Sequence, residues 1–298
     1  MPEASVVDIA VTSAKELAGH TRHGPVRPAV RLFRSELRLV FGRRRNLLLL
    51  AVVAAFPVLI GVGLRVTSRP GSGGGGLAFV SQLTGNGIFL SFIALTVLLT
   101  LVLPVVVAVV AGDSVAGEAG YGTLRYLLAV PAGRTRLLAA KYAAIVTFGL
   151  AATFVVTAAA LLTGVALFPV GPVTLLSGTT VPLAAGLVRL LFVTLYVAAA
   201  MAALGAIGLA ISTLTEHSIG AIAAVAIIVV ASEVADTVPQ FAVIHPYLPT
   251  HWWTTFDSLL RVPIDTTTML HGLLSFAVYT VIFGSFAWAR FSNADVTS

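Results

Sequence analysis

Cysteine is absent from this chain of 298 residues, and charged residues make up only 10% of it. The first absence excludes a disulfide framework, a thiolate metal site and a cysteine nucleophile. The scarcity of charge, beside 58% hydrophobic residues, excludes a soluble globular protein and a disordered chain. The apolar residues form long unbroken runs, which excludes an outer-membrane β-barrel with its alternating strands. The sequence therefore predicts an all-α polytopic membrane protein.

Six apolar stretches are long enough to cross a hydrocarbon core of about 30 Å, which takes about 20 residues of α-helix. The predicted spans lie at about 46–66, 88–111, 143–168, 188–211, 218–235 and 269–291, within a transmembrane domain of residues 46–291. The segment before the first span is too long and too polar for a signal peptide, so we expect that span to be retained. An even number of spans places both termini on one side of the membrane.

The basic residues are distributed unevenly between the two sides. Nine precede the first span, four lie in the loop between spans two and three, and Arg290 lies near the C-terminus. The other side receives Arg65, Arg69, Arg189 and Arg261. By the positive-inside rule the N- and C-termini are predicted to be cytoplasmic, with residues 292–298 as a short cytoplasmic tail. This topology accounts for the net charge of +6, so we expect no nucleic-acid partner.

The segment before the first span has two parts. Residues 1–27 show no sustained period and are predicted to be a mobile cytoplasmic tail. In residues 28–45, apolar side chains recur at helical spacing opposite basic and polar ones. The two sets are Val30, Phe33, Leu37, Val40 and Phe41 against Arg31, Arg34, Ser35 and Arg38. The pattern predicts an interfacial amphipathic helix whose basic face meets anionic headgroups of the lipid bilayer, or alternatively a cytosolic helix packed on a partner.

Two longer stretches fall on the predicted external side. Residues 67–87 contain a glycine run, Gly71–Gly76 with one serine, and are predicted to be a flexible loop. Residues 236–268 combine prolines with aromatic side chains, which favours short external helices at the membrane surface before the last span. His245 and His251 lie there and His271 lies in span six, but their spacing favours packing roles, and no metal site is predicted.

The cytoplasmic loop 112–142 between spans two and three is unusually patterned: GDSVAGEAGYGTLRYLLAVPAGRTRLLAAKY. Apolar residues follow Gly122-Thr123, and Pro131 with Gly133 interrupts the chain before a second helical start that ends at Lys141. The pattern predicts a helix, a break and a second helix where a soluble partner could bind. The alternative is that Glu118 caps a helix and that the arginines only follow the positive-inside rule.

This loop resembles that of ABC-2 permeases, the membrane subunits of type 2 ABC transporters. In that family the loop after span two has a Gly-Glu pair, then Gly-Thr, Leu-Leu, Pro, Arg and a Lys that begins span three. The matching positions are Gly117-Glu118, Gly122-Thr123, Leu127-Leu128, Pro131, Arg134 and Lys141. The basic helix, the six spans and the stretch from His245 to Pro249 extend the resemblance over most of the chain. Ala119-Gly120-Tyr121 departs from it, because the family often has a basic or amide residue there.

The resemblance implies a coupling helix that transmits the closure of a separate ATPase subunit to the membrane helices. The implied partner contacts are Glu118, Gly122, Thr123, Arg125, Pro131 and Arg134. It also implies two ABC ATPase subunits, which hold ATP and Mg, and a second permease copy or a homologous permease, with spans one, two and five between the halves. The chain itself has no G-x-x-x-x-G-K-[ST] sequence, so we expect no catalytic residue, no cofactor and no ATPase activity in it.

The spans hold few ionisable groups, which disfavours a proton- or sodium-driven transporter. Glu233, roughly 21 Å along span five, is predicted to line a pathway, to pair with Arg65 or Arg189, or to reach interfacial water at a helix end. Pro57 and Pro104 are predicted to kink spans one and two.

The loop pattern differs from that of ABC importers and favours export. Apolar spans suit an amphipathic or hydrophobic cargo, such as a drug, lipid or lipopeptide. We therefore predict an exporter permease in a bacterial plasma membrane. The alternative function is a non-transporting membrane component that docks an ATPase for signalling or envelope remodelling.

Overall fold

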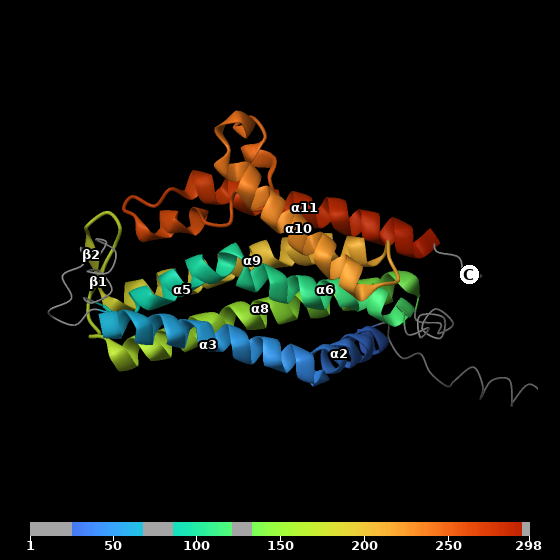
Figure 1. The fold of residues 1–298 in the computed structure, drawn as a ribbon, viewed down its shortest axis with the longest axis horizontal. Helices are drawn as coiled ribbons and strands as arrows, with labels where there is room; N and C mark the ends of the chain where they lie inside the picture. Colours follow the sequence, from blue (N-terminus) through green and yellow to red (C-terminus); the bar gives the residue numbers. More distant parts are fainter. Residues whose placement is uncertain (1–25, 68–85, 121–132, 294–298) are drawn as a thin grey trace, which may run out of the picture.

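The computed structural model describes residues 26–67, 86–120 and 133–293. Within these ranges the chain is almost entirely helical, and six helices are long and apolar enough to cross a membrane. Their bounds are α3 Arg44–Thr67, α6 Val102–Gly120, α8 Arg134–Leu167, α9 Leu183–Ser212, α10 Ser218–Thr237 and α11 Thr266–Asn293. The predicted all-α polytopic membrane protein with six spans is confirmed. Most of these helices run along the long axis of an elongated bundle (Figure 1).

The second predicted span is broken into two helices. α5 (Phe89–Thr100) ends before Leu101, whose φ of −144° and ψ of −47° leave the helical region, and α6 starts at Val102. Pro104 explains the break, because a proline has no N–H and its ring clashes with the carbonyl four residues earlier, here that of Thr100. The kink predicted at Pro104 is therefore a full interruption. Pro57, by contrast, lies inside the continuous helix α3.

Two elements differ from the predicted loop between spans two and three. α6 continues to Gly120, so the first part of residues 112–142 is helical and extends the broken span. α8 is one helix of 34 residues, and the predicted separate helical start before residue 143 belongs to it. At a rise of 1.5 Å per residue α8 is about 51 Å long, well beyond a core of about 30 Å.

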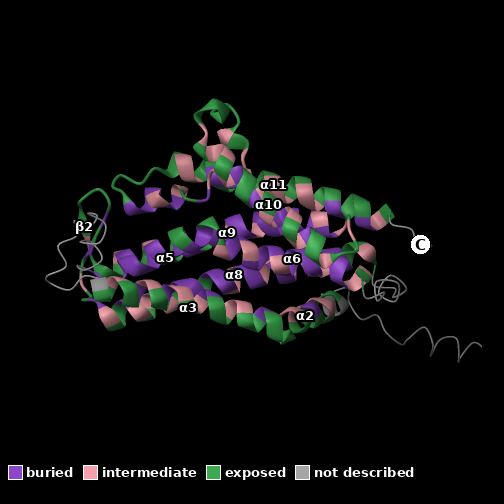
Figure 2. Cartoon of the chain, viewed as in Figure 1, coloured by how far each residue is buried: buried purple, intermediate pink, exposed green. Residues whose placement is uncertain are grey.

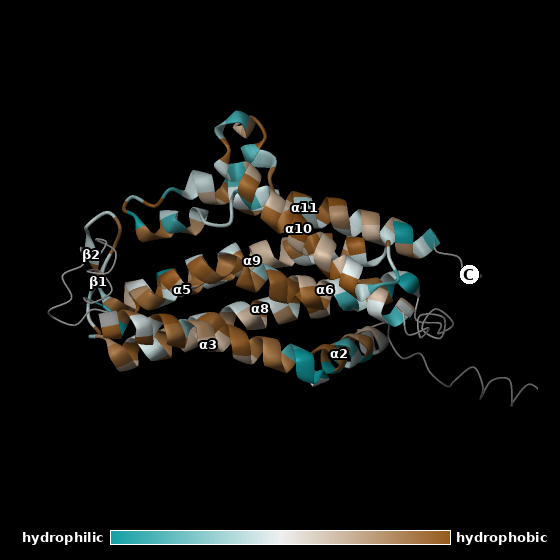
Figure 3. Ribbon diagram, in the orientation of Figure 1, coloured by the Kyte–Doolittle hydropathy of each residue, from teal (hydrophilic) through white to brown (hydrophobic). Residues whose placement is uncertain are grey.

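The helices are buried to different degrees. In the most apolar window of α9, 72% of the residues are buried, against 17% for both α3 and α11. Figure 2 shows the buried residues concentrated along α5, α6, α8 and α9, with exposed residues on the outer helices. Those exposed residues are largely apolar, and the outer helices are mostly brown in the ribbon of Figure 3. An apolar exterior of this kind suits a lipid environment, because the bilayer core offers no water to polar groups.

α2 (Val26–Gly42) precedes the first span and packs against α8. Leu32, Val40 and Phe41 contact the core, and the predicted polar face is exposed, namely Arg31, Arg34, Ser35 and Arg38. The amphipathic helix is therefore confirmed, with two differences. Val30 of the predicted apolar face is exposed, and the buried face carries an acid, Glu36. Val26 and Asn293 lie at the same end of the bundle, which we call the α2 end (Figure 1).

The opposite end carries a short β-hairpin (Figure 1). β1 (Val173–Thr174) and β2 (Thr180–Val181) pair antiparallel between α8 and α9. Three 3-10 helices follow α10: η1 Pro239–Phe241, η2 His245–Tyr247 and η3 Thr255–Leu260. They confirm the predicted short helices before the last span. η3 ends beside the hairpin, where the Leu176 N–H donates to the Leu260 carbonyl at 2.8 Å, whereas the chain directly after α10 projects from the side of the bundle. We call residues 238–264 the cap, and the end of the bundle with the hairpin the cap end.

Candidate functional site

The described chain brings together the two ends of the predicted coupling loop. α6 ends at Gly120, and α8 begins at Arg134 after Gly133, whose φ of +75° is a left-handed conformation that favours glycine. Four of the predicted contact residues, Gly122, Thr123, Arg125 and Pro131, lie outside the described residues. The two that are described, Glu118 and Arg134, both take part in contacts within the chain.

Glu118 belongs to a buried ion triad. Lys141 Nζ, from α8, lies 2.5 Å from Glu118 Oε1 in α6 and 3.3 Å from Glu36 Oε2 in α2. The three side chains are 2%, 12% and 8% exposed, in the order Lys141, Glu118, Glu36. Removing one member of such a set is costly, because it leaves a buried charge without its partner. The triad therefore fastens α2 to both ends of the loop.

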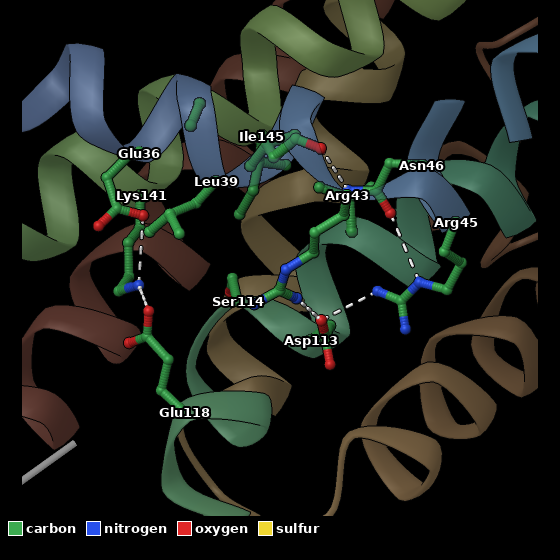
Figure 4. A pocket seen from close by; sticks show the side chains of 13 residues that line it. Glu36, Leu39, Arg43, Arg45, Asn46, Asp113, Ser114, Glu118, Lys141 and Ile145 are labelled. Atoms are coloured by element: carbon green, nitrogen blue, oxygen red, sulfur yellow. Dashed lines mark hydrogen bonds and ion pairs between the residues drawn. The ribbon is translucent and has the colours of Figure 1, made fainter. Parts of the chain in front are cut away.

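A second group of charges lies beside the triad (Figure 4). The Arg43 and Arg45 guanidinium groups both donate to Asp113 Oδ2, with an Arg45 Nη2 to Oδ2 distance of 2.9 Å. Asp113 is buried in α6, one and a half turns before Glu118. Gly117 leaves room for this carboxylate, since a Cβ at residue 117 would lie 2.6 Å from Asp113 Oδ1. Steric contact with Asp113 thus explains why a glycine stands before Glu118.

The turn between α2 and α3 is also held by a side chain. Asn46, which is buried, donates from Nδ2 to the Val40 carbonyl oxygen at 2.8 Å. That carbonyl belongs to the last turn of α2, where a helix leaves acceptors without intrahelical donors. The angle between the amphipathic helix and the first span is therefore set by a hydrogen bond as well as by the two groups of ion pairs.

α9 reaches into α6 between the two groups. The backbone N–H groups of Val115 and Ala116 donate to Ser212 Oγ at 3.0 and 2.9 Å, and Ser212 Oγ donates to the Gly112 carbonyl at 2.8 Å. In a regular helix those N–H groups would donate to the carbonyls four residues earlier. A side chain inserted in this way is a recognised cause of bending. Ser212 thus contacts the backbone of α6 between Asp113 and Glu118.

Arg134 connects the loop to the C-terminal helix. Its Nη1 donates to the Ser292 carbonyl at 2.7 Å, and Trp288 Nε1 donates to Thr135 Oγ1 at 3.0 Å. The first turn of α8 therefore holds the last turns of α11. Together with the triad, this contact joins α2, α6, α8 and α11 around the ends of residues 121–132.

Glu233 lies away from the α2 end, in the last turns of α10. Thr250 of the cap and Asp236 lie near it. The alternative of an ion pair with Arg65 or Arg189 is wrong, and Arg189 Nη1 donates to the carbonyls of Leu259 and Arg261 instead. Among the described residues, no ion pair includes Glu233. Its position near the end of α10 agrees with the predicted helix-end location.

The histidines of the cap surround one aspartate of α10. His251 Nδ1 is 2.6 Å from Asp236 Oδ1, and His245 Nδ1 is 3.8 Å from it. The His271 ring lies 5.9 Å from the Trp252 ring, as measured between centroids. No group of three or more His, Asp or Glu side chains in the described ranges could hold a metal ion.

Glu36, Asp113 and Ser212 were not predicted as members of the site. Glu36 had a detectable signal, since it is the only acidic residue between Glu16 and Asp113 and stands on the apolar face of an amphipathic helix. Asp113 was visible as an acid directly after an apolar span. Ser212 had no signal, because a serine at a helix end is ordinary.

A comparison with protein families matches residues 50–297 to one described as "Protein of unknown function (DUF2705)". No curated protein matches the chain.

Proposed function

The chain belongs to the DUF2705 family, whose function is unknown, and we propose that it is the permease subunit of an ATP-binding cassette exporter. Two permeases, identical or homologous, would form the pathway for an amphipathic or hydrophobic cargo, and two ATPase subunits would bind beneath them. The ATPase subunits would hold ATP and Mg.

The observation that supports this proposal best is the set of ion pairs that connects the two ends of the loop to each other and to α2. Lys141 contacts both Glu118 and Glu36, so any displacement of residues 121–132 would act on α6, α8 and α2 together. α2 leads directly into the span α3, and Asp113 links that junction back to α6. A partner that pushes on the loop would therefore move three membrane helices as a unit.

The structure suggests a division of roles among the predicted contacts. Glu118 is engaged by Lys141, and Arg134 by Ser292, so both would hold the loop in place from behind. Gly122, Thr123, Arg125 and Pro131 remain the proposed contacts with the ATPase. In this proposal Ser212 supplies the bending point at which motion of the loop enters α6.

The test of partnership is affinity purification of the tagged protein from native membranes in mild detergent. We expect an ABC ATPase to co-purify with the unmodified chain and to be lost from Arg125→Glu. Arg261→Glu, a charge reversal at an exposed residue of the cap, is the matched control and should retain the ATPase. Recovery of no ATPase, or equal recovery with both variants, would overturn the proposal.

Transport separates the exporter from a component that only docks an ATPase. The complex is reconstituted into vesicles and tested with a panel of fluorescent amphipathic compounds and lipids. ATP-dependent movement of at least one compound is expected from the exporter. ATP hydrolysis without movement of any compound would favour signalling or envelope remodelling.

We also propose that the α2 end faces the cytoplasm of a bacterial cell. The lack of cysteine in the sequence allows single-cysteine labelling without background. Ser177 at the cap end and Ser35 on α2 are both exposed. A membrane-impermeant maleimide should label Ser177→Cys in cells with an opened outer envelope, and Ser35→Cys only after the plasma membrane is permeabilised. The reverse pattern would invert the orientation.

A further inference from the structure

Two arginines at the junction of α2 and α3 share one acid. Arg43 and Arg45 both donate to Asp113 Oδ2, and the Asp113 side chain is 8% exposed. The arginine side chains themselves are 41% and 48% exposed. A buried carboxylate thus fixes the position of two guanidinium groups, while about half of each arginine side chain remains open to the surroundings.

The charge of this group is not balanced. Two guanidinium ions contact one carboxylate, which leaves an excess of one positive charge. The neighbouring triad of Glu36, Glu118 and Lys141 carries one excess negative charge, and Glu118 is close enough to Arg43 to attract it, so the case for a ligand rests on the donors that remain without an acceptor. Within the described part of the chain, Arg43 Nε and Nη2 and Arg45 Nη1 have no hydrogen-bond partner. A guanidinium group offers five N–H donors in a planar fork. The acceptor oxygens of an anion can therefore bind to the donors that have no partner within the chain.

The surroundings of the two arginines indicate where such an anion comes from. They lie where the amphipathic helix gives way to a span, and Leu47 and Leu48 are exposed in the first turns of that span. Leu39, also exposed, lines the same pocket as Arg43, Arg45 and Asp113 (Figure 4). Polar and apolar surfaces meet here over a few residues. A ligand that combines an anionic head with a hydrocarbon tail matches both.

We propose that Arg43 and Arg45, held by Asp113, bind the phosphodiester group of an anionic phospholipid. The phosphate oxygens accept hydrogen bonds from the outward donors of both guanidinium groups, and the acyl chains lie along the exposed face of α3. Arginine suits this role because its fork can bind phosphate through two parallel hydrogen bonds. Basic groups near the ends of membrane helices are a known means of binding such headgroups. This lipid site is independent of any ATPase partner.

The test measures lipid enrichment around the purified protein. The protein is reconstituted in nanodiscs with equal amounts of phosphatidylglycerol and phosphatidylcholine, extracted gently, and its bound lipids are counted by native mass spectrometry. Phosphatidylglycerol should be enriched, and Arg43→Gln/Arg45→Gln should reduce the enrichment by about tenfold, since bidentate charge-assisted hydrogen bonds are lost. Arg136→Gln/Arg290→Gln removes the same charge from exposed residues of α8 and α11 and should leave most of it. Equal losses from both double variants would overturn the site in favour of diffuse attraction.

A second double variant controls for loss of the fold. Arg43→Lys/Arg45→Lys keeps the charge and the contact with Asp113 but removes the planar fork. We expect it to elute as a single species in size-exclusion chromatography and to show an intermediate enrichment. Enrichment equal to that of the unmodified protein would overturn the bidentate geometry.

Two further measurements identify the source of the phosphate and the class of ligand. Inorganic phosphate and glycerophosphoglycerol, which lack acyl chains, should not displace the bound lipid at millimolar concentration. Displacement by either would overturn a lipid site in favour of a soluble anion. If Arg43→Gln/Arg45→Gln keeps its lipid but no longer co-purifies with a protein partner, the arginines dock that partner and the lipid proposal is wrong.

Discussion

The two ends of the bundle are held together in different ways. At the α2 end, charged side chains from different helices contact one another, as in the triad of Glu36, Glu118 and Lys141. At the cap end, several contacts between elements go to backbone atoms, beside side-chain pairs such as that of His251 with Asp236. Arg189 donates to the carbonyls of Leu259 and Arg261, and Tyr196 Oη donates to that of Trp252 at 2.8 Å.

A close contact between two backbone segments also distinguishes the cap end from the α2 end. Gly87, just before α5, touches Gly164 in α8 so closely that a Cβ on Gly164 would lie 2.0 Å from the Gly87 carbonyl oxygen. Asn86 Nδ2 donates next to this contact, to the carbonyls of Gly171 and Pro172 at 2.7 and 3.0 Å. Backbone positions cannot be exchanged without moving whole helices, whereas ion pairs can change partners. The close backbone contact of Gly87 with Gly164 therefore makes the cap end a fixed joint, whereas the ion pairs allow the α2 end to rearrange.

The largest expected effect is that of Lys141→Met. It leaves two carboxylates buried against each other without their cation, and we expect a loss of about 3–5 kcal/mol in the free energy of unfolding. The midpoint of thermal unfolding in detergent measures it. Glu36→Gln/Glu118→Gln/Lys141→Met, which removes all three charges, should recover most of the loss. A triple variant as unstable as Lys141→Met would show that packing of the lysine, and not charge, holds the α2 end.

Gly164→Ala should give the next largest effect. The added methyl group meets a carbonyl oxygen that belongs to the backbone, so we expect a loss of about 1–3 kcal/mol from overpacking. The same thermal unfolding measures it. Gly284→Ala in α11 is the matched control, because a Cβ there meets nothing within 4 Å. An alanine tolerated equally at both positions would contradict the fixed joint at the cap end.

Tyr196→Phe should weaken the attachment of the cap only slightly. The variant loses a hydroxyl that contacts both the Trp252 carbonyl and the Thr255 hydroxyl, but the Thr255 hydroxyl itself also donates to that carbonyl, at 2.8 Å. The carbonyl therefore stays satisfied, and we expect a loss of about 0.5–1.5 kcal/mol. Limited proteolysis of the cap, beside thermal unfolding, measures the local effect. A loss as large as that of Lys141→Met would show that the cap depends on one side chain.

The smallest effect concerns Asp265, an exposed acid at the cap end. The Thr268 hydroxyl and the backbone N–H groups of Thr268 and Thr267 donate to it and hold its pKa below the ordinary value. Because the pKa of Asp265 is lower in the folded state, its hydrogen bonds stabilise the start of α11 fully at pH values above the ordinary carboxyl pKa. This stabilisation is lost as the pH falls through the lowered pKa. Asp265→Ala should therefore reduce the unfolding midpoint at pH 7 and differ less from the unmodified protein in acid.

A control for this pH dependence is Asp265→Asn. Asparagine caps helices about as well as aspartate and carries no titrating group, so its contribution should not change with pH. If the difference between the alanine variant and the unmodified protein is constant from pH 7 to acid, the hydrogen bonds to Asp265 do not favour its charged form.

Much of the fold could be predicted because its signals are local. Apolar runs of about 20 residues, the helical period of residues 28–45 and the prolines of the cap each act within one element. The break at Leu101 is also local in cause, since Pro104 interferes with the carbonyl of Thr100. The full length of α8 was missed because its polar first turns resemble a loop, and packing against α2 and α11 supports them.

The candidate site could be predicted only in part. The resemblance of the loop to that of ABC-2 permeases singled out Glu118 and Lys141. Their contact with each other across the loop, and the involvement of Glu36 and Asp113, were not predicted. The predicted pairing of Glu233 with Arg189 was wrong because backbone carbonyls of the cap offered closer acceptors to that arginine.

The sequence by itself determined that this chain is a six-span membrane protein with an amphipathic helix before the first span, because hydropathy and period act over short distances along the chain. Only the tertiary structure decided which charges meet. Lys141 and Glu36 are 105 residues apart, and Arg43 and Asp113 are 70 apart. No local pattern specifies such pairs. They form because helix packing buries Lys141, Glu36 and Asp113, and a buried charge is stable only beside an opposite one.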